Sequence, residues 1–252
     1  MSSTVFSGSS DGYDRFMGPY SRQLAPKFVD FAQPSGRVLD VGAGTGALTQ
    51  ELLDRGFDVA AVEPSDDFIA TLRERFPSVD VRDAAAESLP WSDATFDAVL
   101  SQLVVAFLPD AVAAVREQRR LLRAGGVAAA CMWELDGIAI MAVLNEVRER
   151  LQPGGGGSRV ERWRSETELR ALFEEAGFAD VATTTIEIST EYGSVDELWS
   201  AAVETAGPGG NPTAGMPPHA LTAGREAMAD VLDRPDGSFT LNARCACVRG
   251  IR

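Results

Sequence analysis

Hydrophobic and polar positions along the first half of the chain follow the pattern of strands separated by helices. Short apolar runs predict strands at 37–41, 58–62, 79–81, 96–101 and 127–133. The stretches between them have helix signals, such as residues 47–55, which end at Gly56. Strands that alternate with helices pair in parallel through right-handed crossovers, so this half predicts an α/β sheet.

Two longer strands are expected in the second half of the chain. Residues 181–191 and 237–248 alternate between apolar and polar positions, and residues 194–233 lie between them as an insertion that includes a helix near 220–232. At the other end, residues 1–36 form an N-terminal segment whose apolar positions predict a helix over 20–31. We therefore expect a helical cap segment at 1–36 and one main domain at 37–252.

The run from Val38 to Ala47 carries the most chemical information. Its sequence V-L-D-V-G-A-G-T-G-A predicts a buried strand that breaks into a glycine-rich turn and restarts as a helix. Glu63 follows Gly42 by 21 positions, where a nucleotide-binding βαβ unit places an acid on the ribose hydroxyls. A nucleoside cofactor is therefore expected, although Gly42, Gly44 and Ala47 also satisfy the spacing of a nicotinamide dinucleotide site.

Several further segments indicate which nucleoside cofactor is expected. Asp40 and Gly46 complete D-V-G-A-G-T-G, which resembles motif I of class I S-adenosylmethionine (SAM)-dependent methyltransferases, in particular the small-molecule, type 11-like domain. The resemblance continues in order along the chain. Residues 61–65 resemble the family's ribose-binding segment, 82–90 its adenine segment, 95–101 its fourth strand and 121–126 the turn before its fifth strand. An ordered set of matches is more specific than the glycine pattern alone.

The resemblance implies both a fold and an activity. The fold is a Rossmann-like seven-stranded sheet, mostly parallel with an antiparallel last strand, with helices on both faces and a helical cover at about 194–233. The activity is transfer of the SAM methyl group to a small organic acceptor by in-line displacement, without a metal. An NAD(P)-binding oxidoreductase and a SAM-binding protein that has lost turnover remain as alternatives.

The expected cofactor site lies at the carboxyl ends of the strands. The resemblance implies Asp40 on the cofactor ammonium, the glycine turn against its methionine and ribose parts, Glu63 on the ribose, and Asp83 with the Ala84 amide on the adenine. Gln102 follows the fourth strand at the sheet edge where open α/β sheets bind ligands. The N-terminal segment resembles a cap in which Tyr13 covers the donor methyl and Arg22 meets the methionine carboxylate, or it is a helix that only packs on the sheet.

A catalytic base is less defined. A base assists only when the acceptor is an oxygen or an acidic carbon. The candidates are His219, the only histidine, and Glu134 at the end of the fifth strand. A role for His219 as a helix cap or surface residue competes with catalysis.

Composition narrows the class of partner. The formal charge is −14 and Lys27 is the only lysine, which argues against nucleic acid. No apolar run is long enough to span a bilayer, so we expect a cytoplasmic monomer or homodimer that has no membrane partner. Cys131, Cys245 and Cys247 show no metal-ligand spacing in the sequence, so they are expected to be buried free thiols.

Overall fold

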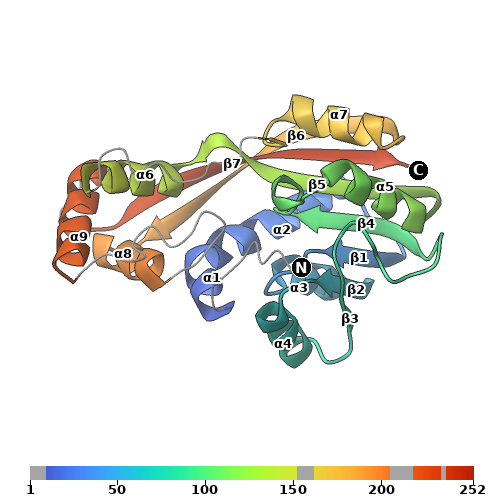
Figure 1. Ribbon diagram of the computed structural model, residues 1–252, viewed down its shortest axis with the longest axis horizontal. Coiled ribbons are helices and arrows are strands. Elements are labelled where there is room, and N and C mark those ends of the chain that lie inside the picture. The colour runs from blue at the N-terminus through green and yellow to red at the C-terminus, as the bar shows by residue number, and fades with distance from the viewer. Residues whose placement is uncertain (1–9, 152–161, 205–217, 234–236) are drawn as a thin grey trace.

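The computed structural model describes residues 10–151, 162–204, 218–233 and 237–252 (Figure 1). The strands are β1 (Arg37–Val41), β2 (Asp58–Glu63), β3 (Asp80–Asp83), β4 (Phe96–Gln102), β5 (Leu122–Ile138), β6 (Ala179–Tyr192) and β7 (Phe239–Ile251). The helices are α1 (Ser10–Phe16), α2 (Gly18–Ala32), α3 (Ala47–Asp54), α4 (Asp66–Arg75), α5 (Ala111–Leu121), α6 (Ala139–Leu151), α7 (Glu166–Glu175), α8 (Val195–Glu204) and α9 (Pro218–Leu232), with a short 3₁₀ turn at Val105–Phe107.

The strands form one seven-stranded sheet in the order β3-β2-β1-β4-β5-β7-β6. Strand β7 runs antiparallel to both of its neighbours, β5 and β6, while the other pairs are parallel. The predicted fold class is therefore confirmed, including the antiparallel last strand. Tyr192, the last residue of β6, pairs with Phe239, the first residue of β7, so β7 starts at the end of the sheet where β6 finishes and runs back antiparallel to it.

Helices cover both faces of the sheet. Neighbouring residues of β7 show this directly, because successive side chains of a strand point to opposite faces. Arg249 donates to the carbonyl of Phe31 at the end of α2, whereas Gly250 lies against Phe173 of α7. Helices α2 and α3 contact each other, and so do α5 and α7.

The antiparallel strands extend beyond the parallel part of the sheet. Strands β5, β6 and β7 have 17, 14 and 13 residues, against 4 to 7 for the parallel strands. Helices α6, α8 and α9 gather at their far end (Figure 1). There Trp199 of α8 packs against Gly224 of α9, so this tryptophan belongs to the core of the extension.

Some boundaries differ from those predicted. Strand β5 was expected at 127–133 and begins instead at Leu122, because its first residue pairs with Phe96 of β4. At its other end Ile138 pairs with Ala243 of β7, so a partner strand prolongs it. The region predicted as an insertion, 194–233, contains α8 and α9, and its residues 205–217 lie outside the described part of the chain. None of the described helices combines the length and apolarity needed to cross a bilayer.

Candidate functional site

The glycine turn is fastened to the neighbouring strand. The backbone amides of Gly42 and Ala43 both donate to the carbonyl oxygen of Val62, at 2.8 and 3.1 Å. Val62 precedes Glu63, the last residue of β2. These two bonds therefore place the turn after β1 directly beside the Glu63 carboxylate, as the sequence spacing predicted.

Glu63 is a buried carboxylate held by two backbone amides. Its Oε2 accepts from the Gly44 amide at 2.9 Å, and its Oε1 accepts from the Ser65 amide at 3.1 Å. Asp83 stands opposite it at the end of β3 and is exposed. Burial raises the pKa of Glu63, and the negative charge of Asp83 raises it further. The two amides therefore orient the Glu63 carboxylate but offset only part of the cost of burying its charge. A carboxylate in this state suits a ligand that donates hydrogen bonds.

Gly44 and Gly46 are needed for different reasons. Gly44 has φ +57° and faces open space, with no atom within 4 Å of the position that a Cβ would take. A ligand can therefore approach its backbone closely. Gly46 has φ +92°, and a Cβ there would overlap the Phe76 ring of the segment after α4. Gly46 allows the helices to pack, whereas Gly44 leaves room for a ligand.

A second acidic side chain lies beneath the turn. Asp40 is 1% exposed, and its Oδ2 accepts a hydrogen bond of 2.7 Å from the Thr49 hydroxyl on α3. Burial raises the pKa of Asp40 to about 7, with a further contribution from the nearby Glu63 charge. Two buried carboxylates and the exposed Asp83 therefore surround the turn, and this arrangement favours a ligand that carries positive charge.

Tyr13 of α1 lies near Glu63. Its ring lies 5.6 Å from that of Phe68 on α4, and its hydroxyl lies 3.5 Å from Ser21 Oγ. Burial raises the pKa of Tyr13, and the charge of Glu63 acts in the same direction, as expected for neighbouring groups. Arg22 is different, since it is exposed and its guanidinium lies against Gly18 of its own helix.

A polar cluster that the sequence did not indicate connects α1 to the glycine turn. The Thr45 hydroxyl donates to Asp14 Oδ1 at 2.5 Å, and Arg75 Nη2 pairs with Asp14 Oδ2 at 2.6 Å. Arg75 Nη1 also donates to the Thr45 carbonyl at 3.0 Å. We call Asp14, Thr45 and Arg75 the clasp. Asp14 stands next to Tyr13 in the sequence, but no local signal marks Arg75, whose partners come from other elements.

The end of β4 carries an incompletely satisfied amide. Gln102 Nε2 donates to the Ser21 carbonyl of α2 at 3.0 Å, whereas its buried Oε1 has no hydrogen-bond partner among the described residues. Leu103 follows with φ +65°, and its amide donates to the Cys131 carbonyl at 2.9 Å. This backbone conformation is rare for leucine and occurs where the strand leaves the sheet, a position typical of binding sites.

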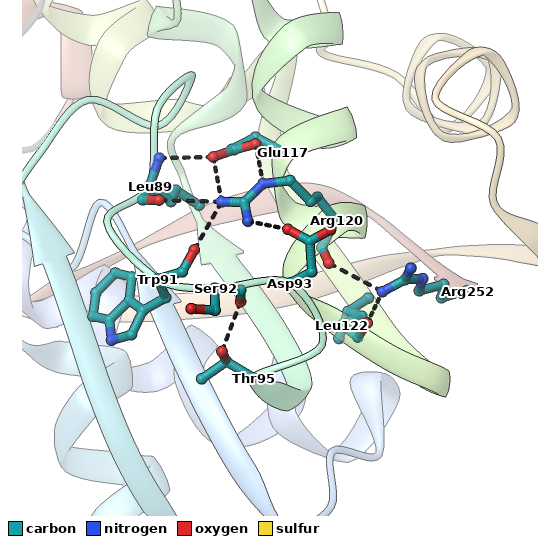
Figure 2. A network of polar contacts seen from close by, with 9 residues as sticks. All are labelled: Leu89, Trp91, Ser92, Asp93, Thr95, Glu117, Arg120, Leu122 and Arg252. Carbon is teal, nitrogen blue, oxygen red and sulfur yellow. Dashed lines mark hydrogen bonds and ion pairs between the residues drawn. The ribbon is translucent and has the colours of Figure 1, made fainter.

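Helix α5 holds the loop that follows Asp83 and Ala84 (Figure 2). Arg120 donates to the carbonyls of Leu89 and Trp91 at 3.2 and 3.0 Å, and pairs with Asp93 at 2.6 Å. Glu117 pairs with Arg120 at 2.7 Å and accepts from the Leu89 amide at 3.0 Å. The expected adenine segment is therefore anchored by α5, a contact that no local sequence pattern predicts.

The two candidate bases lie in other surroundings. Glu134 Oε1 accepts from the Thr185 hydroxyl at 2.8 Å, and its Oε2 lies 3.3 Å from Arg244 Nε. Thr185 also bonds Glu166 of α7, so this network lies on the α7 face of the sheet. His219 lies in the first turn of α9, and its side chain is outside the described part of the structure. A catalytic role for either residue stays a prediction.

The cysteines are buried and free, as predicted, but the sheet brings them together. Their sequence spacing left them ungrouped, whereas the register of β5 and β7 places their three sulfur atoms within 4.8 Å of one another. Sequence spacing missed this group because its members come from two strands.

The chain shows clear similarity to known proteins at this site. Residues 39–130, from the middle of β1 into β5, match the family model described as a methyltransferase domain. Over these residues the chain contains a methyltransferase domain. An uncharacterised methyltransferase of Mycobacterium tuberculosis is 38% identical over 115 residues, which are 44% of this chain and 47% of that protein. The match thus spans about half the length of this relative.

Two further comparisons extend beyond the methyltransferase domain. The malonyl-[acyl-carrier protein] O-methyltransferase of Halorhodospira halophila is 29% identical over 245 residues, covering 92% of this chain and 80% of that protein. Phospholethanolamine N-methyltransferase 2 of Haemonchus contortus, solved with S-adenosylhomocysteine, is similar in fold with a TM-score of 0.56. It is 14% identical, and the alignment covers 96% of this chain and 59% of that one.

Proposed function

We propose that the methyltransferase domain binds SAM at the glycine turn and transfers its methyl group to a small organic acceptor. The observation that carries this proposal is the pair of buried carboxylates, Asp40 and Glu63, beside a turn left open at Gly44. A relative in fold holds S-adenosylhomocysteine, the product that SAM leaves after transfer. Both the family and the charge of the site support the same cofactor.

The residues of the site fit the parts of SAM. Glu63 accepts hydrogen bonds, as the ribose hydroxyls require, and Asp40 supplies negative charge for the ammonium group. Asp83, which pairs with Glu63 in the sheet, and Ala84, which follows β3, would face the adenine. Gln102 has an unpartnered oxygen at the end of β4 that can accept a hydrogen bond from the ligand.

The chain contributes position and exclusion of water. SAM supplies an electrophilic methyl group on a sulfonium, which an acceptor attacks in line. The glycine turn and Glu63 would fix the nucleoside, while α1 covers that side and places Tyr13 near Glu63. Holding two reactants in line and away from water lowers the barrier without a covalent enzyme intermediate.

The same charges disfavour a dinucleotide. Glu63 suits the ribose of either cofactor, but a pyrophosphate bound at the glycine turn would lie near Asp40, the buried acid beneath the turn. Like charges in a partly buried site repel strongly, because little water screens them. The nicotinamide alternative therefore has less support than SAM.

Binding of S-adenosylhomocysteine by calorimetry tests the cofactor assignment. We expect Glu63→Gln to weaken binding by at least about tenfold, since a hydrogen bond to a charged group is worth about 1.5–3 kcal/mol. Glu74→Gln on the exposed face of α4 makes the same change of charge and serves as the control. Equal affinities for the two variants would contradict the proposal.

Methyl transfer from labelled SAM to a panel of small acceptors tests the reaction itself. The panel should include carboxylic acids and acyl thioesters, because a relative is named for O-methylation of malonyl-[acyl-carrier protein]. Product formation that disappears with Glu63→Gln would support transfer. Tight binding without turnover on any acceptor would instead favour a SAM-binding protein that has lost catalysis.

A further inference from the structure

Three cysteines from two strands of the sheet meet on one face. Cys131 of β5 pairs in register with Cys247 of β7, and Cys245 lies two positions before Cys247 on the same face. All three residues are 0% exposed, and their sulfur atoms lie within 4.8 Å of one another. We call them the thiol cluster.

Helix α2 covers this face of the sheet. Trp133, two positions after Cys131, contacts the Tyr20 ring of α2 edge-on at 6.2 Å. On the other strand, Arg249 lies two positions after Cys247 and donates to the end of α2. The cluster is therefore enclosed between the sheet and α2, where a bound ion would be shielded from water.

The sulfur atoms contact each other and the backbone of their own strand. Cys245 Sγ lies 3.8 Å from the Ala246 carbonyl oxygen, and Cys247 Sγ lies 3.6 Å from the Cys245 carbonyl oxygen. Thiols are weak donors, so contacts of this length hold the side chains loosely. The sulfur atoms can shift toward a common centre without breaking strong bonds.

The geometry is close to that of a trigonal metal site. With metal–sulfur bonds of about 2.3 Å, three sulfur atoms in a plane with the ion are about 4 Å apart. Because the largest separation here is 4.8 Å, each sulfur needs to move inward by no more than about 0.5 Å. A shift of this size requires only a small change of the side-chain torsion angles.

The number and type of ligands select the ion. Among the described residues the group consists of three cysteines, with no histidine or carboxylate as a fourth member. Structural zinc sites are almost always four-coordinate, whereas soft thiolates also select Cu(I). We propose that Cys131, Cys245 and Cys247 form a buried three-coordinate thiolate site for a soft monovalent ion, Cu(I). Each thiol that binds the ion releases its proton to solvent.

Competition with a chromogenic Cu(I) chelator under reducing, anaerobic conditions tests the site. We expect the full chain to withdraw about one equivalent of Cu(I) and to gain thermal stability, because an ion that binds only the folded state stabilises it. Cys247→Ser should lower the affinity at least about tenfold. Met132→Leu, a buried sulfur-bearing neighbour whose side chain points to the other face, is the matched control and should bind as the wild type does.

A measurement on the wild-type protein keeps the test independent of variant folding. X-ray absorption at the copper edge should show sulfur neighbours at about 2.3 Å, as expected for thiolate ligands. Oxygen or nitrogen neighbours, no withdrawal of Cu(I), or undiminished binding by Cys247→Ser would overturn the assignment. Retention of Zn(II) in place of Cu(I) would overturn the monovalent, three-coordinate site.

Discussion

Gly44 provides a test of ligand approach that is separate from backbone strain. Gly44 and Gly56 both have positive φ and open surroundings. Gly56, however, lies between α3 and β2, before the amino end of the strand whose carboxyl end carries Glu63. We expect Gly44→Ala and Gly56→Ala to lose similar stability, about 1–2 kcal/mol each. Only Gly44→Ala should also lose affinity for S-adenosylhomocysteine, by at least about tenfold, when measured by calorimetry. Unchanged affinity would mean that the open space at Gly44 does not face the ligand.

The raised pKa of Asp40 predicts that the stability of the unliganded protein depends on pH. Because its pKa is raised from 3.8 to about 7 in the folded chain, its contribution to stability is full below about pH 4. That contribution is lost as the pH rises through about 7, when the carboxyl must ionise in a dry site. Relative to Asp40→Asn, the wild type should lose up to about 4 kcal/mol between pH 4 and pH 8. Urea unfolding at several pH values measures it, and parallel curves for the two proteins would refute it.

At the scale of elements, the clasp fastens α1 over the glycine turn. Asp14 is 17% exposed and Arg75 is 40% exposed at the side chain, so the ion pair is partly screened and worth about 1 kcal/mol. We expect Asp14→Asn and Arg75→Met each to speed the release of S-adenosylhomocysteine several-fold. Stopped-flow displacement measures the rates. The double variant should be less affected than the sum of the two, and simple additivity would show that the pair is not coupled.

Helix α5 should stabilise the loop after Asp83 through Arg120. The Arg120→Met variant removes donors from two backbone carbonyls and from Glu117 and Asp93 together (Figure 2). We expect a loss of about 2–3 kcal/mol in the free energy of unfolding. Arg116→Met on the same helix breaks an ion pair that is 58% exposed on both sides and should change stability by less than about 0.5 kcal/mol. Equal losses in chemical denaturation would contradict this role.

At the scale of the whole molecule, α1 lies between two parts of the fold. It contacts α4 beside the parallel strands and α8 on the antiparallel extension (Figure 1). A ligand held beneath α1 would therefore stabilise contacts across the molecule. The net charge of −14 attracts cations and repels anions, so it favours a cationic ligand over an anionic one.

Thermal unfolding in the presence of ligands tests this whole-molecule consequence. S-adenosylhomocysteine at about 100 times its dissociation constant should raise the free energy of unfolding by about 2.7 kcal/mol. The same concentration of NAD⁺ should leave the transition unchanged, because its pyrophosphate would lie near the buried Asp40. Stabilisation by NAD⁺ alone would reverse the choice of cofactor.

Much of the candidate site around the glycine turn could be predicted from local sequence. The turn from β1 into α3 and the position of Glu63 follow from the spacing of glycines and apolar residues within one βαβ unit. The direction of Arg22 is not a local property: its guanidinium lies against Gly18 of its own helix, and its contact with a methionine carboxylate stays a prediction. The predicted bounds of β5 were too short for a similar reason, since its first residue pairs with Phe96 of β4 and its last with Ala243 of β7.

The sequence by itself determined the parallel half of the sheet, the glycine turn and the acid beside it, because backbone conformation and apolar periodicity are local properties of the chain. Only the tertiary structure decided the clasp, the Arg120 network and the thiol cluster. Each of these joins residues from separate elements, and the register and packing that bring them within bonding distance depend on the energy of the whole fold rather than on any one segment.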